Sequence, residues 1–110
     1  MAAFNKFQPF VEKVAEKVFN LGSDQLTLAL SSAAPAAANG QLSDLTQISY
    51  TNLSSRNLTT SSSAQTSGTY KLVVADLVLT ASGGSVAAFR YVSMYDDTAT
   101  NDELIGYWDY

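Results

Sequence analysis

Four carboxylates lie close together near the end of the chain, and their type suits them to hold a cation. Asp96, Asp97, Asp102 and Glu103 fall within one short polar segment. A hard cation such as Ca²⁺ takes several oxygen ligands from a loop. The spacing does not match the calcium loop with its central glycine and terminal glutamate. The pattern therefore favours a solvated hairpin turn over a calcium site.

Other groups that could carry catalysis are scarce. The chain has no histidine and no cysteine, which removes the commonest general base and every thiolate. Serine and threonine are plentiful, but a hydroxyl nucleophile needs a base, and Lys71 falls within a predicted strand. The segment Ser82-Gly83-Gly84-Ser85 precedes a strand and not a helix, so it predicts a hairpin turn. We expect a non-enzymatic protein with no cofactor and no metal.

Aromatic residues gather in the last quarter of the chain. On adjacent strands such residues form either a platform for a sugar or a protein, or cross-strand pairs in a core. The sequence favours the core, and the platform remains open as the alternative. The group comprises Phe89, Tyr91, Tyr95, Tyr107, Trp108 and Tyr110.

The charge balance excludes one class of partner. Six basic against ten acidic residues leave a net charge of −4, whereas nucleic-acid binding needs a clustered basic face. Charged residues make up 15% of the chain, against about 25% in an average protein, and serine and threonine take their place. No run approaches the ~20 apolar residues of a membrane span. We expect a protein that binds neither nucleic acid nor membrane, is made in the cytoplasm, and presents a hydroxyl-rich surface to other proteins.

The first element that must position these residues is an α-helix predicted over residues 8–20. Pro9 suits the first helical position, apolar side chains recur at helical spacing, and Gly22 follows as a C-terminal cap. The period changes to two over residues 26–31, which predicts a half-buried strand. The serine- and threonine-rich stretch over residues 50–67 is typical of an edge strand or a long arm.

Longer runs of β-forming residues follow, joined by turns and without a helical crossover, at residues 70–80, 86–95 and 104–110. Such a series predicts an antiparallel meander. We expect a single, mainly β domain over residues 1–110: an antiparallel β-sandwich or barrel-like meander over residues 25–110, with one N-terminal α-helix. The last strand is predicted to be an apolar edge, which needs cover. Either a partner covers it or the natural chain continues beyond Tyr110.

Several stretches carry a resemblance that spans nearly the whole chain. They are Ala2-Ala3-Phe4-Asn5-Lys6-Phe7, Phe10-Val11-Glu12, Asn20-Leu21-Gly22-Ser23-Asp24, Ser63-Ala64-Gln65-Thr66-Ser67-Gly68-Thr69-Tyr70-Lys71-Leu72, Thr80-Ala81-Ser82-Gly83-Gly84-Ser85, Phe89-Arg90-Tyr91 and Asn101-Asp102-Glu103-Leu104-Ile105-Gly106. Through them the chain resembles a family of small virion structural proteins of tailed bacteriophages. The family offers no catalytic motif. Its members continue past the aromatic strand, so the resemblance implies a truncated or shortened version.

The resemblance implies a place in the virion for a protein made in the bacterial host cytoplasm. The first expectation is a decoration (cement) protein that binds and stabilises the capsid shell. Its partners would be the major capsid protein or other virion proteins, in a homo-oligomeric or symmetric array. The second is a neck, tail or fibre component, and the third is a carbohydrate- or receptor-binding module. The candidate contact residues are Phe4, Phe7, Pro35, Thr59, Thr60, Ser63, Trp108 and Tyr110.

Overall fold

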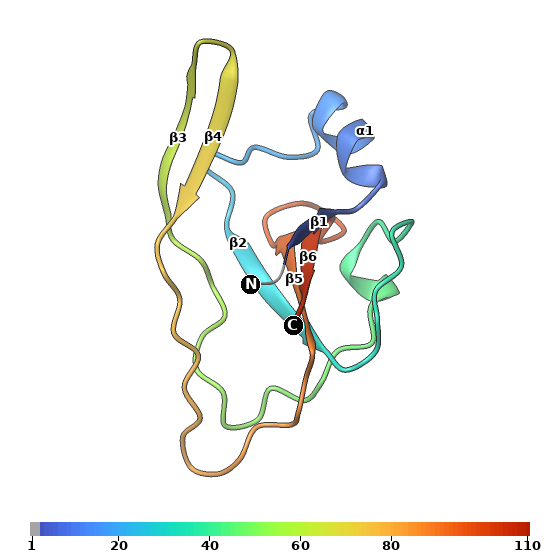
Figure 1. The fold of residues 1–110 in the computed structure, drawn as a ribbon, viewed down its shortest axis with the longest axis vertical. Helices are drawn as coiled ribbons and strands as arrows, with labels where there is room; N and C mark the ends of the chain where they lie inside the picture. Colours follow the sequence, from blue (N-terminus) through green and yellow to red (C-terminus); the bar gives the residue numbers. More distant parts are fainter. Residues whose placement is uncertain (1–2) are drawn as a thin grey trace.

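Strands make up most of the regular structure in the computed structural model, which describes residues 3–110. In chain order the elements are β1 (Phe4–Lys6), α1 (Pro9–Ala15), β2 (Leu26–Ser31), the 3-10 turn η1 (Leu42–Asp44), β3 (Thr60–Thr66), β4 (Thr69–Val74), β5 (Tyr91–Asp96) and β6 (Leu104–Asp109). Four strands form an antiparallel sheet in the order β1-β6-β5-β2, and β3 pairs with β4 in a second (Figure 1). The predicted mainly β, antiparallel fold with an N-terminal α-helix is confirmed.

Side-chain alternation gives the four-stranded sheet two apolar faces. β2 pairs with β5 so that Leu28 lies opposite Met94 and Ala29 opposite Ser93, and successive side chains point to opposite faces. One face packs a cluster of Phe7, Ala29, Tyr95 and Leu104, with Leu42, Leu45 and Tyr107 against it. Since both faces are covered, β2 is buried along nearly its whole length and is not the half-buried strand that its alternation suggested.

The second face carries the cluster that joins the two sheets. Leu26, Met94 and Ile105 of the four-stranded sheet pack there with Leu58. Side chains from α1, the segment after it, β4 and the stretch after β4 cover this cluster, namely Phe10, Phe19, Leu21, Leu72, Val74 and Leu77. The end of β4 therefore packs on one face of the first sheet, which gives a sandwich-like arrangement at the base of the hairpin.

β3 and β4 form a hairpin arm that projects beyond the body of the molecule (Figure 1). Its two-residue turn, Ser67-Gly68, has positive φ angles of 51° and 83°, which match the twist of a tight hairpin. Beyond the base of the arm, the segments that precede β3 and follow β4 stay side by side as a ribbon, made of residues 52–59 and 75–82. The Ala75 N–H, for example, donates to the Thr59 carbonyl. Residues 56–58 of this ribbon bond to β2 and cover its outer edge. The stretch expected as an edge strand or a long arm thus forms β3 of the arm and, through isolated bonds and not as a strand, covers the edge of β2.

The helix is shorter than predicted. α1 spans Pro9–Ala15, not residues 8–20, and Lys17 leaves the helical region with a φ of 66°. Gly22 is therefore not its cap. Val11 and Val14 are 54% and 46% exposed, so the apolar stripe is only partly buried. Too little packing surface faces this stripe to extend the helix further.

Two of the predicted strands are also shorter. β4 ends at Val74 and not at Thr80, and β5 begins at Tyr91 and not at Val86. Of the residues between them, 75–82 run along 52–59 with scattered bonds, such as that from the Ser54 N–H to the Thr80 carbonyl. β propensity alone does not make a strand where no regular partner runs alongside.

β6 is not an edge strand, contrary to the expectation from its position in the sequence. It lies between β5 and β1, and Phe4 pairs with Trp108 while Lys6 pairs with Gly106. The Phe4 ring packs 4.8 Å from the Trp108 ring, measured between centroids, and it also lies over Gly106. The missing side chain at Gly106 gives this ring its place, so β1 docks as an aromatic cover on β6.

Replacing Gly106 with alanine should destabilise the fold by about 1–3 kcal/mol. The new Cβ would overlap the Phe4 ring and approach the Asn5 carbonyl oxygen to 2.8 Å. Gly40→Ala is the matched control, because its Cβ would meet Pro9 at an ordinary 3.6 Å. Urea unfolding of the two variants measures the difference; equal midpoints would show that Phe4 does not rest on Gly106.

Candidate functional site

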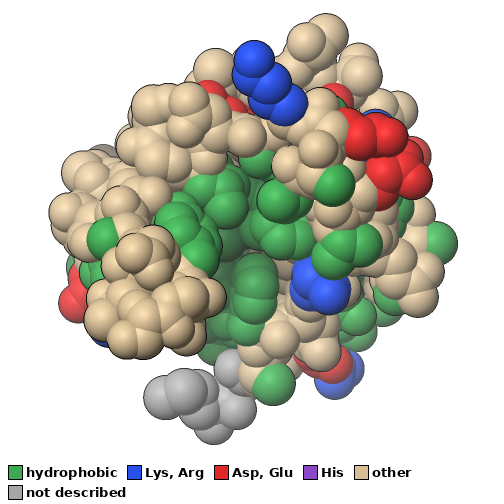
Figure 2. Space-filling view, turned by 90° about the horizontal axis from the view of Figure 1, so that it is seen from above, with side chains coloured by type: hydrophobic (Ala, Val, Ile, Leu, Met, Phe, Trp, Pro, Cys, Tyr) green, Lys and Arg blue, Asp and Glu red, His purple; other side chains and the backbone are tan. Residues whose placement is uncertain are grey.

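Three of the predicted contact residues line one groove. Phe4, Trp108 and Tyr110 surround a hollow of about 480 Å³ between the four-stranded sheet and the ribbon. Its other lining residues are mainly apolar and include Leu28, Leu58, Leu72, Val74, Leu77 and Met94. Figure 2 shows hydrophobic side chains gathered in a hollow flanked by polar ones. Phe4 and Tyr110 are 47% and 70% exposed, so aromatic surface is available at this groove.

Phe7 was predicted as a contact residue, and the structure contradicts this. Its side chain is fully buried and its ring packs 5.0 Å from that of Tyr107, between centroids. The Phe7 N–H donates to the Ile105 carbonyl at 3.1 Å, which extends the pairing of β1 with β6. Phe4 and Phe7 are three positions apart on an extended chain, so they face opposite sides of the sheet. Phe7 therefore belongs to the core and Phe4 to the surface.

The other predicted contact residues lie on two separate surfaces. Thr59 and Ser63 are exposed and Thr60 is half-buried, all at or near β3. The Ser63 hydroxyl bonds the Tyr70 hydroxyl across the hairpin at 2.8 Å. Pro35 is half-buried in the loop between β2 and η1, on the other side of the four-stranded sheet from the arm (Figure 1).

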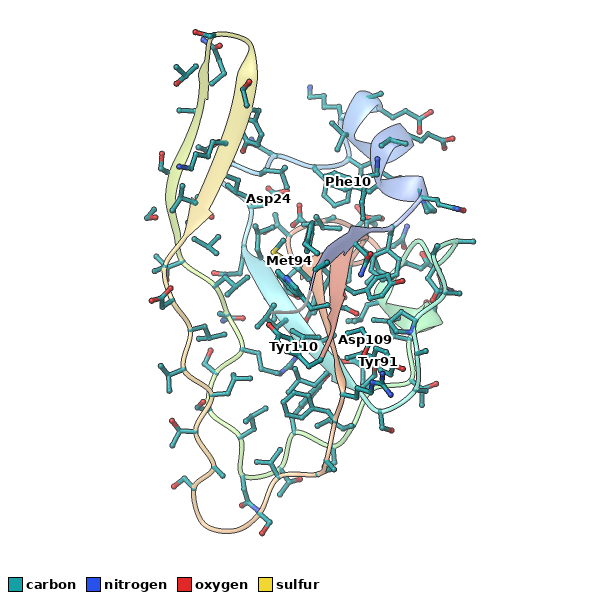
Figure 3. All side chains as sticks on the ribbon, viewed as in Figure 1. Phe10, Asp24, Tyr91, Met94, Asp109 and Tyr110 are labelled. Carbon is teal, nitrogen blue, oxygen red and sulfur yellow. The ribbon has the colours of Figure 1, made fainter. Side chains whose placement is uncertain are left out.

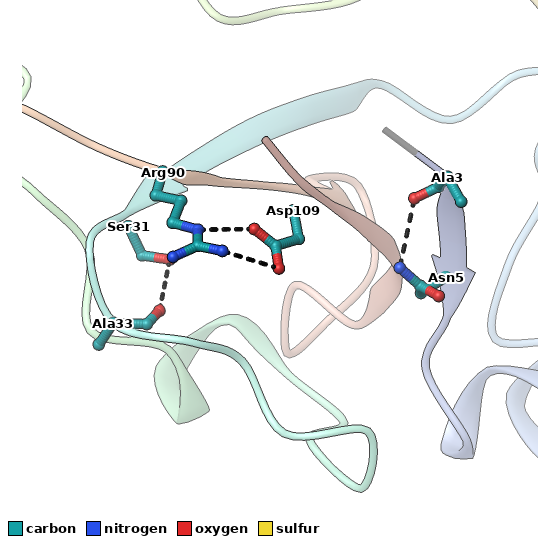
Figure 4. Close-up of polar contacts among 6 residues, drawn as sticks. All are labelled: Ala3, Asn5, Ser31, Ala33, Arg90 and Asp109. Carbon is teal, nitrogen blue, oxygen red and sulfur yellow. Dashed lines mark hydrogen bonds and ion pairs between the residues drawn. The ribbon is translucent and has the colours of Figure 1, made fainter. Parts of the chain in front are cut away.

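The aromatic residues divide between core and surface. Tyr95 is buried, and Tyr91, Tyr107 and Trp108 are half-buried. Phe89 and Tyr110 are exposed. Asp109, Tyr91 and Tyr110 gather at the end of the sheet far from Asp24 (Figure 3). There Arg90 Nε donates to Asp109 Oδ1 at 2.7 Å (Figure 4). Because their exposure differs, these rings do not form one continuous platform.

The acidic segment is only partly the solvated turn that its composition suggested. Asp97 is exposed and Asp102 is half-buried, but Asp96 and Glu103 are buried. Asp96 Oδ1 accepts the N–H groups of Thr98 and Ala99. Glu103 Oε1 accepts the Asn101 N–H. The two buried carboxylates thus fix the turn by accepting hydrogen bonds from its backbone N–H groups.

A second carboxyl group, far away in the sequence, lies against Asp96. Burial and the neighbouring carboxyl of Asp24 raise the pKa of Asp96 to about 7. One oxygen of Asp96 and one of Glu103 are buried without a hydrogen-bond partner. Figure 3 places Asp24 where the chain from α1 turns toward β2. The position of Asp96 directly after the strand predicted over residues 86–95 was the available sign of burial, and nothing in the sequence paired it with Asp24.

The same carboxylates are the groups that a metal ion would need as ligands. Within residues 3–110, no three acidic side chains are placed to share an ion. Two carboxyls that share a site ionise less readily than separate ones. The Asp24–Asp96 pair is thus better described as a structural contact between the turn and the segment before β2.

A wide cleft lies between α1, the arm and the acidic turn. It has a volume of about 1040 Å³ and mixes charged, hydroxyl and apolar groups. Tyr70 and Ser63 come from the arm, Lys13 and Lys17 from α1 and its C-terminal end, and Asn101 from the turn. Tyr70 is 50% exposed. An exposed ring beside amides and hydroxyls suits a polar ligand with an apolar face.

Comparison of this chain with protein-family models, with curated proteins and with solved structures finds no match. The class that the structure defines is therefore a small, mainly β protein with a projecting hairpin. Across residues 3–110, no helix has the length and apolar character needed to cross a membrane.

The stability of the protein should fall as the pH rises from about 4 to about 7. The pKa of Asp96 is about 7 in the folded protein and about 3.9 in an unfolded chain, so the folded state binds the proton more tightly. The free energy of unfolding then decreases by at most ~1.4 kcal/mol per pH unit across this window. Below the window, the stabilisation that the bound proton contributes is fully present. Burial and acidic neighbours also raise the pKa of Asp102, which acts in the same direction.

Asp96→Asn should remove most of this decline, because the amide keeps the oxygen that holds the turn and cannot ionise. Asp97→Asn, at an exposed neighbour, should leave the decline in place. Urea unfolding at pH 4, 5, 6, 7 and 8 measures both variants. An unchanged slope in Asp96→Asn would assign the pH dependence to other groups.

Proposed function

We propose that this chain is a non-enzymatic structural protein of a tailed-bacteriophage virion, a decoration protein that binds the major capsid protein and stabilises the shell. The observation that carries the proposal is the hairpin arm. Six of the seven residues of β3 are exposed, and Lys71 is the one charged residue of β3 and β4. A two-stranded sheet is marginal in water when it lacks a surface to pack on. Its exposed length therefore suits a partner that completes it.

The chemistry of the arm fits contact with a protein. Hydroxyl side chains make up much of its outer face, and Lys71, which pairs with Ala64, is the one charge there, so a partner needs only one acidic group to dock without leaving a buried charge unpaired. Both outer backbone edges of the two-stranded arm offer N–H and C=O groups that can pair with another strand. A contact of this kind is weak by itself and becomes strong when a particle repeats it many times.

The groove supplies a second contact surface. Phe4 and Tyr110 expose aromatic surface beside apolar side chains, and aromatic residues in a hollow are typical anchors of protein interfaces. Arm and groove lie on neighbouring elements, since Leu72 and Val74 belong to both β4 and the groove wall. One partner surface can therefore cover both.

A neck, tail or fibre position is supported by the same surfaces. The third candidate, a carbohydrate- or receptor-binding module, has one observation in its favour: Tyr70 is exposed beside Ser63 and Asn101 in the cleft between α1, the arm and the acidic turn. Ring stacking with flanking amide and hydroxyl groups is the chemistry that a saccharide needs.

Copy number per particle tests the proposal first. Quantitative mass spectrometry of purified virions, with the major capsid protein as the internal standard, should find hundreds of copies in a simple ratio to it. A dozen copies or fewer would move the protein to the neck or tail. Absence from the particle would reject a virion role and favour the saccharide-binding candidate.

Negative charge on the outer face of the arm should weaken particle binding at least ~10-fold. Ser62 and Ala64 are exposed there, on the side opposite Ser63 and Tyr70. The variant is Ser62→Glu with Ala64→Glu, and the matched control is Ser85→Glu with Ala87→Glu, two exposed positions outside the arm. Co-sedimentation with particles lacking the protein measures binding. Equal binding of the two variants would exclude the arm as the contact.

A further inference from the structure

β1 has an unpaired outer edge. Its residues Phe4, Asn5 and Lys6 are all exposed, and the strand pairs with β6 on its other side. Within the part of the chain that the structure describes, no backbone group bonds to the outer side of this strand. A free edge of this kind accepts a further strand.

The direction of each backbone group on this edge follows from one hydrogen bond. The Phe7 N–H donates to the Ile105 carbonyl of the β6 side at 3.1 Å. Backbone groups alternate in direction along a strand, so those of Asn5 also face β6. The N–H and C=O groups of Phe4 and Lys6 therefore point outward, away from the sheet.

We propose that this edge pairs with the same edge of a second copy, antiparallel, about a two-fold axis at Asn5. Phe4 of each copy then lies opposite Lys6 of the other. Each of these two pairs exchanges two backbone hydrogen bonds, which makes four in all, because the outward groups belong to these residues. The two four-stranded sheets join into one of eight strands.

The side chains favour this register over its neighbours. Phe4 and Lys6 share a face of β1, so the register sets the ammonium of one copy beside the ring of the other, a favourable cation–π arrangement. A register centred on Lys6, or a parallel pairing, would bring the two ammonium groups together. The three-residue sequence Phe4-Asn5-Lys6 is thus complementary to itself in the antiparallel sense, which identifies a second copy as the occupant.

The groove adds apolar area to the same contact. The Phe4 ring stacks on Trp108 at the groove mouth and is 47% exposed. Pairing about Asn5 brings the two grooves together at the axis and covers both Phe4 rings. Three residues per strand bury little surface, so the association is weak and concentration-dependent. The inference concerns the free protein and stands apart from the proposed virion role.

A single cysteine at the axis tests the register. The chain has no cysteine, so Asn5→Cys introduces one thiol per molecule. Facing residues of a non-hydrogen-bonded antiparallel pair have Cα atoms about 4.5 Å apart, which suits a disulfide. The Asn5 side-chain amide donates to the Ala3 carbonyl at 3.2 Å, a contact between residues two positions apart in the chain (Figure 4).

Under mild oxidation, Asn5→Cys should form a disulfide-linked dimer at least ~10-fold faster than Ser62→Cys, an exposed control on the arm. Non-reducing electrophoresis over a concentration series measures the rates. Equal rates would overturn the proposal, since they would show collision without preferred pairing.

A second variant separates edge pairing from the side-chain contact. In the Asn5→Cys background, Lys6→Pro removes an outward N–H and leaves the bonds to β6, whereas Lys6→Ala keeps the N–H. Cross-linking should fall much further with proline than with alanine; an equal fall would overturn the backbone pairing. Sedimentation of the unaltered protein provides a check that needs no substitution. A monomer at every concentration up to the millimolar range would also reject the dimer.

Discussion

Apolar side chains pack on both faces of the β5–β6 pair, and the remaining elements are arranged to keep water from these faces. Tyr95 and Leu104 point to one side, and Met94 and Ile105 to the other. The loop that contains η1 covers the first face, and the ribbon with the segment after α1 covers the second. Each cover comes from a distant part of the chain. The sheet therefore becomes a stable centre only when the whole domain has closed around it.

Sequence periodicity was sufficient to predict an element where that element depends mainly on its own residues. The strand predicted over residues 26–31 matches β2 (Leu26–Ser31), because leucines at every second position need a buried face whatever surrounds them. The helix over residues 8–20 was too long: it ends at Ala15, Lys17 leaves the helical region, and Phe19 packs on the core from the non-helical segment that follows. β1 was missed altogether: three residues with asparagine and lysine show no strand pattern, and only the bare Gly106 backbone makes room for Phe4.

The site residues divide in the same way. The exposure of Thr59 and Ser63 follows from their polarity, and it was predicted. Phe7 was misplaced because alternation on β1, which the sequence did not reveal, sends it inward. The burial of Asp96 beside Asp24 depends on two segments that meet only in the folded chain. A contact between two distant segments produces no pattern in the sequence of either segment, so neither periodicity nor composition predicts it.

The adjacency of Phe4 and Trp108 has a mechanical consequence. The first and last strands in chain order, β1 and β6, run antiparallel, with residues 4 and 108 at the same end of their shared ladder. A force that draws these two ends apart loads the β1–β6 hydrogen bonds one after another and not all at once. The domain should then yield at low force by peeling β1 away, whereas the β5–β6 hairpin, which lies behind it, bears load only afterwards. A molecule held through its surfaces would avoid this weak direction, and one tethered by its two ends would not.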